Sequence, residues 1–250
     1  MTMKKKLLVA LAAFACVVAI VAISVLSTIA YFTSSAVLSN TFTIGNVGIT
    51  LTESKVNEKG EVITGGGTTT EGNIYRLVPG TTYVKNPVIS VTKGSEESYL
   101  FVMIRNDIEK IEIESDTTNA KDETETIEEQ MLANGWKLYT TVSTGNVYLY
   151  CGTTGVEQVT AGPLKPRGIG NLTGNEDIKV PVFQNFTVKA NAEIDTKTFN
   201  AATIMVRAFA VQTQGFEDDK EGTENRKFAY DKAWAALVAA YPYIHTGSAT

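Results

Sequence analysis

Side chains that commonly catalyse reactions or bind transition metals are scarce in this chain of 250 residues. It contains one histidine, His245, and two cysteines, Cys16 and Cys151. Zinc sites take their ligands mainly from these two residue types, so the composition excludes most of them. A Ser-His-Asp triad could use only His245, which lies in a polar tail typical of a frayed end. We therefore expect a protein that is not an enzyme and that uses no cofactor and no metal.

Carboxylates gather in residues 114–129, ESDTTNAKDETETIEE, where a calcium site is the chemistry to consider. The spacing lacks the D-x-[DN]-x-[DN]-G pattern of a calcium-binding loop, and no pair stands out for acid–base catalysis. We interpret residues 114–135 as an acidic, solvated surface insertion that ends in a short helix through Glu129–Leu132 and stops at Gly135. The sequence leaves open whether this insertion binds ions.

The charge balance argues against nucleic acid as a partner. The chain has 22 Lys+Arg against 27 Asp+Glu, a net charge of −5. Phosphate binding needs clustered Lys and Arg, which an acidic chain of this kind does not offer. The glycine run 65–67 is followed by no helix pattern, so we interpret it as a loop or hairpin tip rather than a phosphate cradle.

The first thirty residues have the pattern of a secretory signal peptide. Three lysines at positions 4–6 precede an uncharged run of 19 residues, Leu7 to Val25, and small residues follow, the last of them Ala30. This pattern predicts cleavage between Ala30 and Tyr31 and export of residues 31–250. The alternative is a retained membrane anchor, because a run of this length can span a bilayer. Removal of the leader leaves a net charge of −8.

Cysteine usage allows no intramolecular disulfide in the exported chain. Cys16 lies inside the apolar run, and bulky Phe14 makes the preceding residues a poor lipidation signal. Cys151 is then the only cysteine left after cleavage. Its thiol either packs in the core or forms an intermolecular link, and the sequence leaves both readings open.

Alternation of apolar and polar residues predicts many short strands separated by Gly and Pro turns. The run 99–104 is continuously apolar and predicts a central strand covered on both faces. Within 41–52, the apolar residues Phe42 and Ile44 occupy even positions, whereas Val47, Ile49 and Leu51 occupy odd positions. A bulge or tight turn at Gly45-Asn46 would place both sets on one face of the sheet. The pattern is typical of a single antiparallel β-sandwich or barrel. Further strands are predicted at Trp136–Val142, Asn146–Cys151, Val156–Val159, Ile178–Val188 and Thr203–Gln214, with Pro181 at an edge or a bulge.

Residues 224–241, ENRKFAYDKAWAALVAAY, predict one helix near the C-terminus. Phe228, Trp234 and Leu237 recur near helical spacing, and Pro242 ends the segment. The apolar stripe needs a partner surface, so we expect the helix to pack on the sandwich. A membrane-surface helix is the alternative, but it needs basic residues on its polar face, and only Arg226, Lys227 and Lys232 serve, balanced by Glu224 and Asp231.

Three groups of residues occur in a fixed order along the exported chain: Ala30–Thr33 with Asn40–Val47, Val78–Gly80 with Lys85–Pro87, and Ala210–Phe216 with Ala233–Leu237. Together they resemble the TasA and camelysin family of exported Gram-positive proteins, which have SipW-type signal peptides. The resemblance covers nearly all of the exported chain.

The resemblance implies an antiparallel, jelly-roll-like β-sandwich and removal of the leader by a SipW-type signal peptidase just before Tyr31. It implies a secreted subunit that forms homopolymeric fibres in a biofilm matrix, with other matrix proteins as further partners and membrane contact only before cleavage. The camelysin branch implies a metallopeptidase, although the usual ligand set is missing here. A cell-surface adhesion module held by an uncleaved leader is the other alternative. The acidic insertion and residues 136–177 match no part of the family pattern.

The uncharged segment from Tyr31 to Ile44 is suited to joining a neighbouring subunit. It contains no proline and carries apolar side chains, among them Phe32, Val37 and Leu38. An extended segment can complete the edge of another sheet, and burying four such side chains contributes roughly 6–12 kcal/mol before ordering costs. We expect residues 31–39 to be the donated part. The alternative is that the segment forms the first strand of its own sheet.

Overall fold

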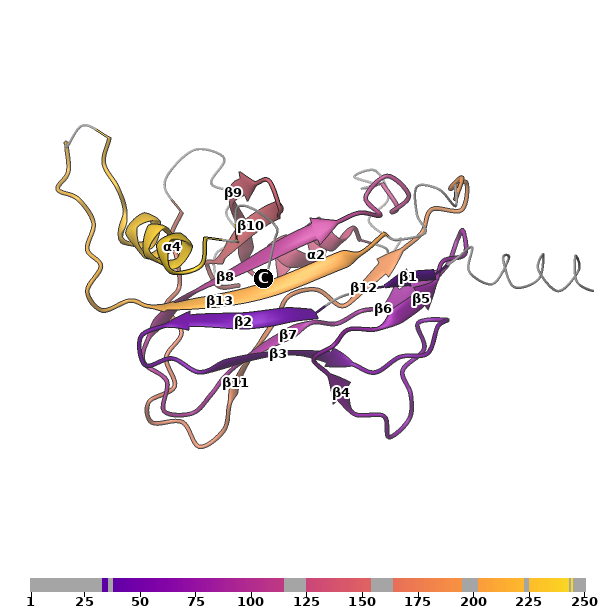
Figure 1. The fold of residues 1–250 in the computed structure, drawn as a ribbon, viewed down its shortest axis with the longest axis horizontal. Coiled ribbons are helices and arrows are strands. Elements are labelled where there is room, and N and C mark those ends of the chain that lie inside the picture. Colours follow the sequence, from indigo (N-terminus) through magenta and orange to yellow (C-terminus); the bar gives the residue numbers. More distant parts are fainter. Residues whose placement is uncertain are drawn as a thin grey trace, which may run out of the picture.

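Two facing β-sheets make up most of the part of the chain that the computed structural model describes (Figure 1). The described residues are 33–35, 38–114, 125–153, 164–194, 202–222, 225–242 and 244. The first sheet has five strands in the order β2-β13-β8-β10-β9, and the second has four in the order β11-β7-β3-β4. Two further strand pairs, β1-β5 and β6-β12, lie together at one end of the molecule (Figure 1).

The expected all-β sandwich with a C-terminal helix is confirmed. Within the described ranges every strand pair is antiparallel except β2 with β13. The strands of the first sheet are β2 (Leu38–Ile44), β8 (Ser98–Asn106), β9 (Trp136–Val142), β10 (Gly145–Tyr150) and β13 (Ile204–Gln212). The second sheet contains β3 (Ile49–Ser54), β4 (Thr68–Thr69), β7 (Val88–Val91) and β11 (Ile178–Pro181). The short pairs are β1 (Thr33–Ser35) with β5 (Ile74–Arg76), and β6 (Thr82–Val84) with β12 (Asn185–Thr187).

Strand β8 is the central strand that the continuous apolar run predicts. It lies between β13 and β10, and both of its faces are buried. Leu100 and Val102 face the core between the two sheets, whereas Phe101 and Met103 belong to a second apolar cluster on the other face of the first sheet. A strand covered on both sides needs apolar residues at every position, which explains why it shows no alternation.

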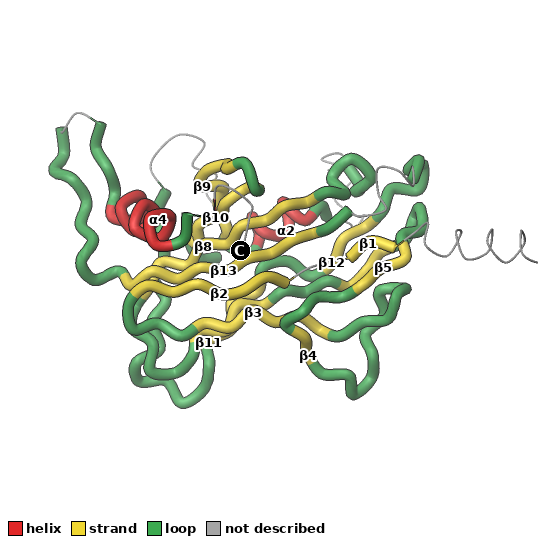
Figure 2. Tube along the Cα trace, in the orientation of Figure 1, coloured by secondary structure: helices red, strands yellow, loops and turns green. Residues whose placement is uncertain are grey.

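Helix α4 (Ala229–Ala240) covers the outer face of the first sheet (Figure 2). Trp234 contacts Phe101 at a ring-centroid distance of 5.1 Å, and Leu237 is fully buried beside them. The helix begins five residues later than the predicted start at residue 224. Phe228 is its N-cap and has an extended backbone. The Phe228 N–H donates to Asp231 Oδ2 at 2.9 Å, and this hydrogen bond fixes the start of the helix.

Helix α2 (Ile127–Ala133) corrects one expectation. A capping box between Thr126 and Glu129 begins it, and Gly135, at φ 89°, follows its end as predicted. However, Ile127 and Met131 are buried in the core between the sheets, so this part of 114–135 is not a solvated insertion. The residue types explain the error, because two apolar side chains four residues apart share one helix face. Residues 115–124 of the same predicted insertion lie outside the described residues.

The remaining strand predictions are largely confirmed. Strand β9 matches its predicted bounds, and β10 and β13 match theirs to within one or two residues. The predicted strand 178–188 is two strands, because β11 ends at Pro181 on the edge of its sheet and β12 begins only at Asn185. The predicted strand 156–159 lies outside the described residues. Neither helix in the described part of the chain has the length and hydrophobicity to cross a membrane, and the predicted leader lies outside that part.

Candidate assembly edge and a buried polar cluster

The N-terminal segment supplies the outermost strand of the first sheet. Strand β2 pairs in parallel with β13, with Leu38 opposite Val206 and Ile44 opposite Val211. Among the strands formed by described residues, none lies beyond β2 in the order of this sheet. The parallel direction differs from the fully antiparallel arrangement expected. Since β2 and β13 come from opposite ends of the chain, no hairpin constrains their relative direction.

Strand β1 pairs with a different part of the molecule. Its three residues run antiparallel to β5, with Thr33 opposite Arg76 and Ser35 opposite Ile74. In the described residues the N-terminal segment therefore forms strands with its own chain, which was the alternative to donation. Of the residues predicted to act at cleavage and donation, Leu38 begins β2. The others, Ala30, Tyr31, Phe32 and Val37, lie outside the described residues.

A glycine turn connects this segment to the rest of the sandwich. Gly45 has a φ of 92°, and the backbone N–H of Asn46 donates to the side-chain oxygen of Gln212 at 3.2 Å. The predicted turn is therefore present, but its expected consequence is wrong. Ile44 packs in the cluster beneath α4, whereas Ile49 lies in the core between the sheets. The turn carries the chain from one sheet to the other, so the two alternating sets serve different faces.

Apolar side chains remain exposed beside β5, the partner of β1. Ile74 is 54% exposed and Val78 is 47% exposed. An open groove of about 550 Å³ adjoins them and is lined by Val78, Pro79 and Tyr83 together with the charged side chains Lys59 and Arg76. The surface next to the N-terminal segment thus offers apolar area that further chain could cover.

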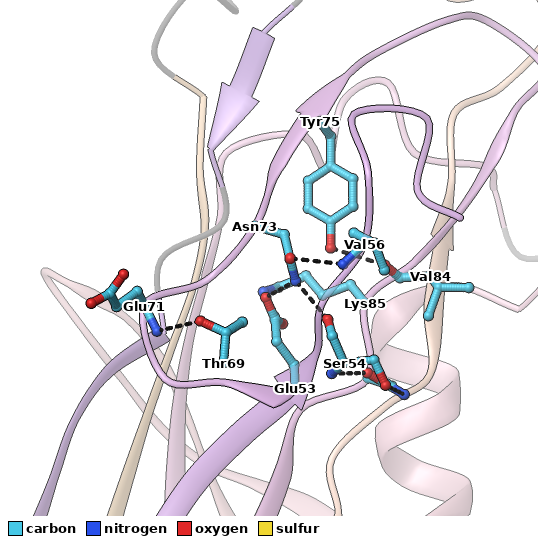
Figure 3. Close-up of polar contacts among 10 residues, drawn as sticks. Glu53, Ser54, Val56, Thr69, Glu71, Asn73, Tyr75, Val84 and Lys85 are labelled. Carbon is cyan, nitrogen blue, oxygen red and sulfur yellow. Dashed lines mark hydrogen bonds and ion pairs between the residues drawn. The ribbon is translucent and has the colours of Figure 1, made fainter. Parts of the chain in front are cut away.

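Below this surface, three polar side chains form a buried cluster that we call the Glu53 cluster: Glu53, Asn73 and Lys85 (Figure 3). Glu53 Oε2 accepts a hydrogen bond from Lys85 Nζ at 2.8 Å. Glu53 Oε1 accepts one from Asn73 Nδ2 at 2.7 Å. Lys85 is 0% exposed, Glu53 is 1% exposed and Asn73 is 8% exposed. A buried ion pair of this kind costs desolvation energy, so it calls for an explanation.

Neighbouring backbone holds the Glu53 cluster in place. Asn73 Oδ1 accepts a hydrogen bond from the Val56 N–H at 3.0 Å, and Asn73 Nδ2 also donates to the Ser54 carbonyl at 2.9 Å. Burial lowers the pKa of Lys85, and the Glu53 charge opposes that effect. Burial also raises the pKa of Tyr75, whose hydroxyl donates to the Val84 carbonyl at 2.9 Å. Every polar group of the cluster therefore has a partner on a fixed strand or strand end.

The Glu53 cluster is not predicted by the sequence patterns above, although one local signal points to it. Glu53 follows Ile49 and Leu51 at a spacing of two, on the inward face of β3. A carboxylate in that position has to meet a buried cation or a donor. Lys85 stands in one of the residue groups that carry the family resemblance, and Asn73 ends a loop rich in Gly and Thr. Their convergence with Glu53 depends on the sheet arrangement, which the sequence does not state.

No metal centre is found in the described ranges, where no three of the His, Cys, Asp and Glu residues are grouped closely enough to hold an ion. His245 and residues 115–124 lie outside these ranges.

No protein-family model, curated protein or solved structure matches the chain. The resemblance to the TasA and camelysin family thus rests on the sequence motifs alone.

Proposed function

We infer that this chain is a secreted structural subunit that polymerises into extracellular fibres of a biofilm matrix by donating its N-terminal segment to a neighbouring copy. The observation that carries the proposal is the position of β2, the outermost strand of its sheet, formed by residues next to the predicted cleavage site. Strand β1, before it, is likewise paired with a single strand, β5.

Such a segment can be exchanged between copies at low cost. Its ladder hydrogen bonds join main-chain groups, so the same strand from another copy would form the same bonds on β13 and β5. Exchange between identical chains makes a heterologous contact, in which two different surfaces meet. Such contacts produce open filaments when the rotation from one subunit to the next does not close a ring. The glycine turn at Gly45 is the natural hinge, because it connects β2 to β3 of the second sheet along the chain.

Removal of the leader would control the exchange. Before cleavage the segment is tethered to the membrane by the leader, and a SipW-type signal peptidase acting between Ala30 and Tyr31 would free it. Protein concentration then decides between monomer and fibre. Pairing between chains prevails only when the concentration of other copies is high enough to compete with the effective concentration of the segment at its own sheet. Other matrix proteins that present a similar sheet edge are further partners.

The experiment is removal of residues 31–39 from the processed protein. We expect a chain that keeps its β-sheet circular dichroism signal and stays monomeric, whereas the full processed chain forms fibres under the electron microscope as its concentration rises. A version in which the same nine residues are replaced by a Gly/Ser sequence is the matched control for length and should also stay monomeric. Fibres from either variant would contradict the proposal, as would a full processed chain that never polymerises.

A further inference from the structure

The Glu53 cluster combines an amine, an amide and a carboxylate in water-excluded contact, which is the set of groups that a self-catalysed amide exchange requires. We propose that Lys85 and Asn73 become joined by an intramolecular isopeptide bond, with Glu53 as the acid–base group. This cross-link goes beyond the proposed function and does not depend on it.

The hydrogen bonds place Glu53 between the two nitrogen atoms that change partners. One carboxylate oxygen lies 2.8 Å from Lys85 Nζ, the attacking nitrogen, and the other lies 2.7 Å from Asn73 Nδ2, the leaving nitrogen (Figure 3). A base must be within hydrogen-bond reach of the proton that it moves, and here a single carboxylate reaches both.

A third contact addresses the charge that develops during attack. When the amine adds to Asn73 Cγ, negative charge moves onto Asn73 Oδ1. The backbone N–H of Val56 already donates to that oxygen at 3.0 Å. A fixed backbone donor aimed at a developing oxyanion is a recurring means of lowering such barriers.

Burial favours the reaction in two ways. It lowers the pKa of Lys85, which brings the neutral, nucleophilic amine within reach by proton transfer to Glu53. It also keeps water away, so hydrolysis does not compete with the amine. Tyr75 lies beside the cluster (Figure 3) and belongs to an aromatic group, in which it packs edge-on against Phe186 at 5.2 Å and Tyr83 stacks on Phe186 at 5.0 Å.

The strands hold the reacting groups in position before any chemistry takes place. Glu53 lies on β3, Asn73 directly precedes β5, and Lys85 directly follows β6. Cross-bonds fix β5 relative to β6, because the Tyr75 hydroxyl donates to the Val84 carbonyl and the Tyr83 hydroxyl donates to the Arg76 carbonyl. Folding therefore already covers the entropic cost of bringing the amine and the amide to the same carboxylate.

The steps balance without any co-reactant. Glu53 takes a proton from the Lys85 ammonium, and the resulting amine attacks Asn73 Cγ, so that a carbon–nitrogen bond forms and the carbonyl electron pair moves to Oδ1. Glu53 then gives its proton to Nδ2 while it accepts one from Nζ. The carbon–Nδ2 bond breaks as the carbonyl re-forms, and one ammonia leaves. The product has a neutral amide in place of a buried ammonium, which relieves the desolvation cost of the ion pair.

The test is the intact mass of the purified, exported chain after its N-terminus has been determined. We expect a mass lower than that of the sequence by one ammonia molecule. Trypsin cannot cut after an amidated Lys85, so peptides 60–76 and 77–93 should be recovered as one branched species that links Asn73 to Lys85. A full sequence mass overturns the proposal. So does a mass loss in which the two peptides remain separate and cleavage after Lys85 is normal, since a succinimide at Asn73 would give that result.

The variant Glu53→Gln tests the role of the carboxylate. It nearly preserves side-chain volume but cannot shuttle the proton, so we expect the full sequence mass and normal cleavage after Lys85. Lys59→Arg, a surface change, is the matched control and should retain the branched peptide. A branched peptide in Glu53→Gln would overturn the assignment of Glu53. If that variant does not fold, the mass and peptide map of the wild-type chain still decide whether the cross-link exists.

Discussion

Glu112 accepts a hydrogen bond from the backbone N–H of Ile127 at 2.6 Å, and this contact holds the first turn of α2 against the sandwich. Asn106 Nδ2 donates to the second carboxylate oxygen at 2.7 Å. Glu112 is only 5% exposed, and burial raises its pKa to about 7, although the two hydrogen bonds act in the opposite direction. This carboxyl group therefore titrates in the folded protein near neutral pH.

The raised pKa of Glu112 predicts lower stability in mild alkali. Because the folded-state pKa is above the unfolded value of 4.5, the folded chain binds more protons between these two values. Stability from this group is then fully present below about pH 4.5 and is lost as the pH rises through about 7. We expect the contribution of Glu112 alone to lower the free energy of unfolding by about 1–3 kcal/mol between pH 5 and pH 8, as measured by urea denaturation.

Glu112→Gln is the control for that pH effect. The variant keeps an acceptor for the Ile127 N–H but has no proton to exchange, so the difference in stability between pH 5 and pH 8 should shrink. Residual pH dependence then reports the other titratable groups. An unchanged difference in the variant would show that Glu112 does not titrate in this range.

Much of the strand content could be predicted because the longer strands carry their own local signals. The apolar run of β8, the bounds of β9 and the turn at Gly45 follow from side-chain types and spacing within a few residues. The C-terminal helix was found for the same reason, since its apolar stripe has helical spacing. Its first turn was misplaced because Arg226 and Lys227 are good helix formers, whereas in the structure the Lys227 N–H donates to Asp219 Oδ2 at 3.0 Å and the helix begins only at Ala229.

Contacts between distant segments could not be predicted. The parallel direction of β2 and the meeting of Glu53, Asn73 and Lys85 depend on how the two sheets are stacked, and short-range patterns do not report that. Helix α2 shows the same limit, because the acidic residues around it suggested solvent while Met131 is fully buried. Composition describes the average of a segment, whereas burial is decided residue by residue.

Docking of α4 should depend strongly on Leu237. This side chain is 0% exposed in the cluster between the helix and the first sheet. Leu237→Ala removes three buried carbon atoms and leaves a cavity, so we expect a loss of about 2–4 kcal/mol in the free energy of unfolding. Leu132→Ala on α2 is the same chemical change at a side chain that is 36% exposed, and it should cost less than about 1 kcal/mol. Equal losses would contradict the proposed packing role of α4.

The thiol of Cys151 should react slowly in the folded protein. Burial raises its pKa to about 11, so the reactive thiolate is scarce at pH 8. Since the unfolded chain has a thiol pKa near the ordinary value of 9.0, we expect reaction with a disulfide reagent to be at least about 10-fold faster in urea. Stopped-flow absorbance with and without urea measures this ratio. A native rate equal to the unfolded rate would indicate a free surface thiol, consistent instead with an intermolecular link.

A reversible lock can test whether the N-terminal segment must leave its own chain. Ser35 lies opposite Ile74 in the β1-β5 pair, so the double variant Ser35→Cys, Ile74→Cys, made with Cys151→Ser, places two thiols on facing residues. The oxidised protein should remain monomeric at concentrations at which the reduced form of the same protein polymerises. A second lock, Thr82→Cys with Thr187→Cys, joins β6 to β12 and leaves the N-terminal segment free, so it should polymerise in both redox states. Fibre growth by the oxidised first variant at the rate of its reduced form would mean that subunits associate without releasing β1, because its disulfide keeps that strand on its own sheet.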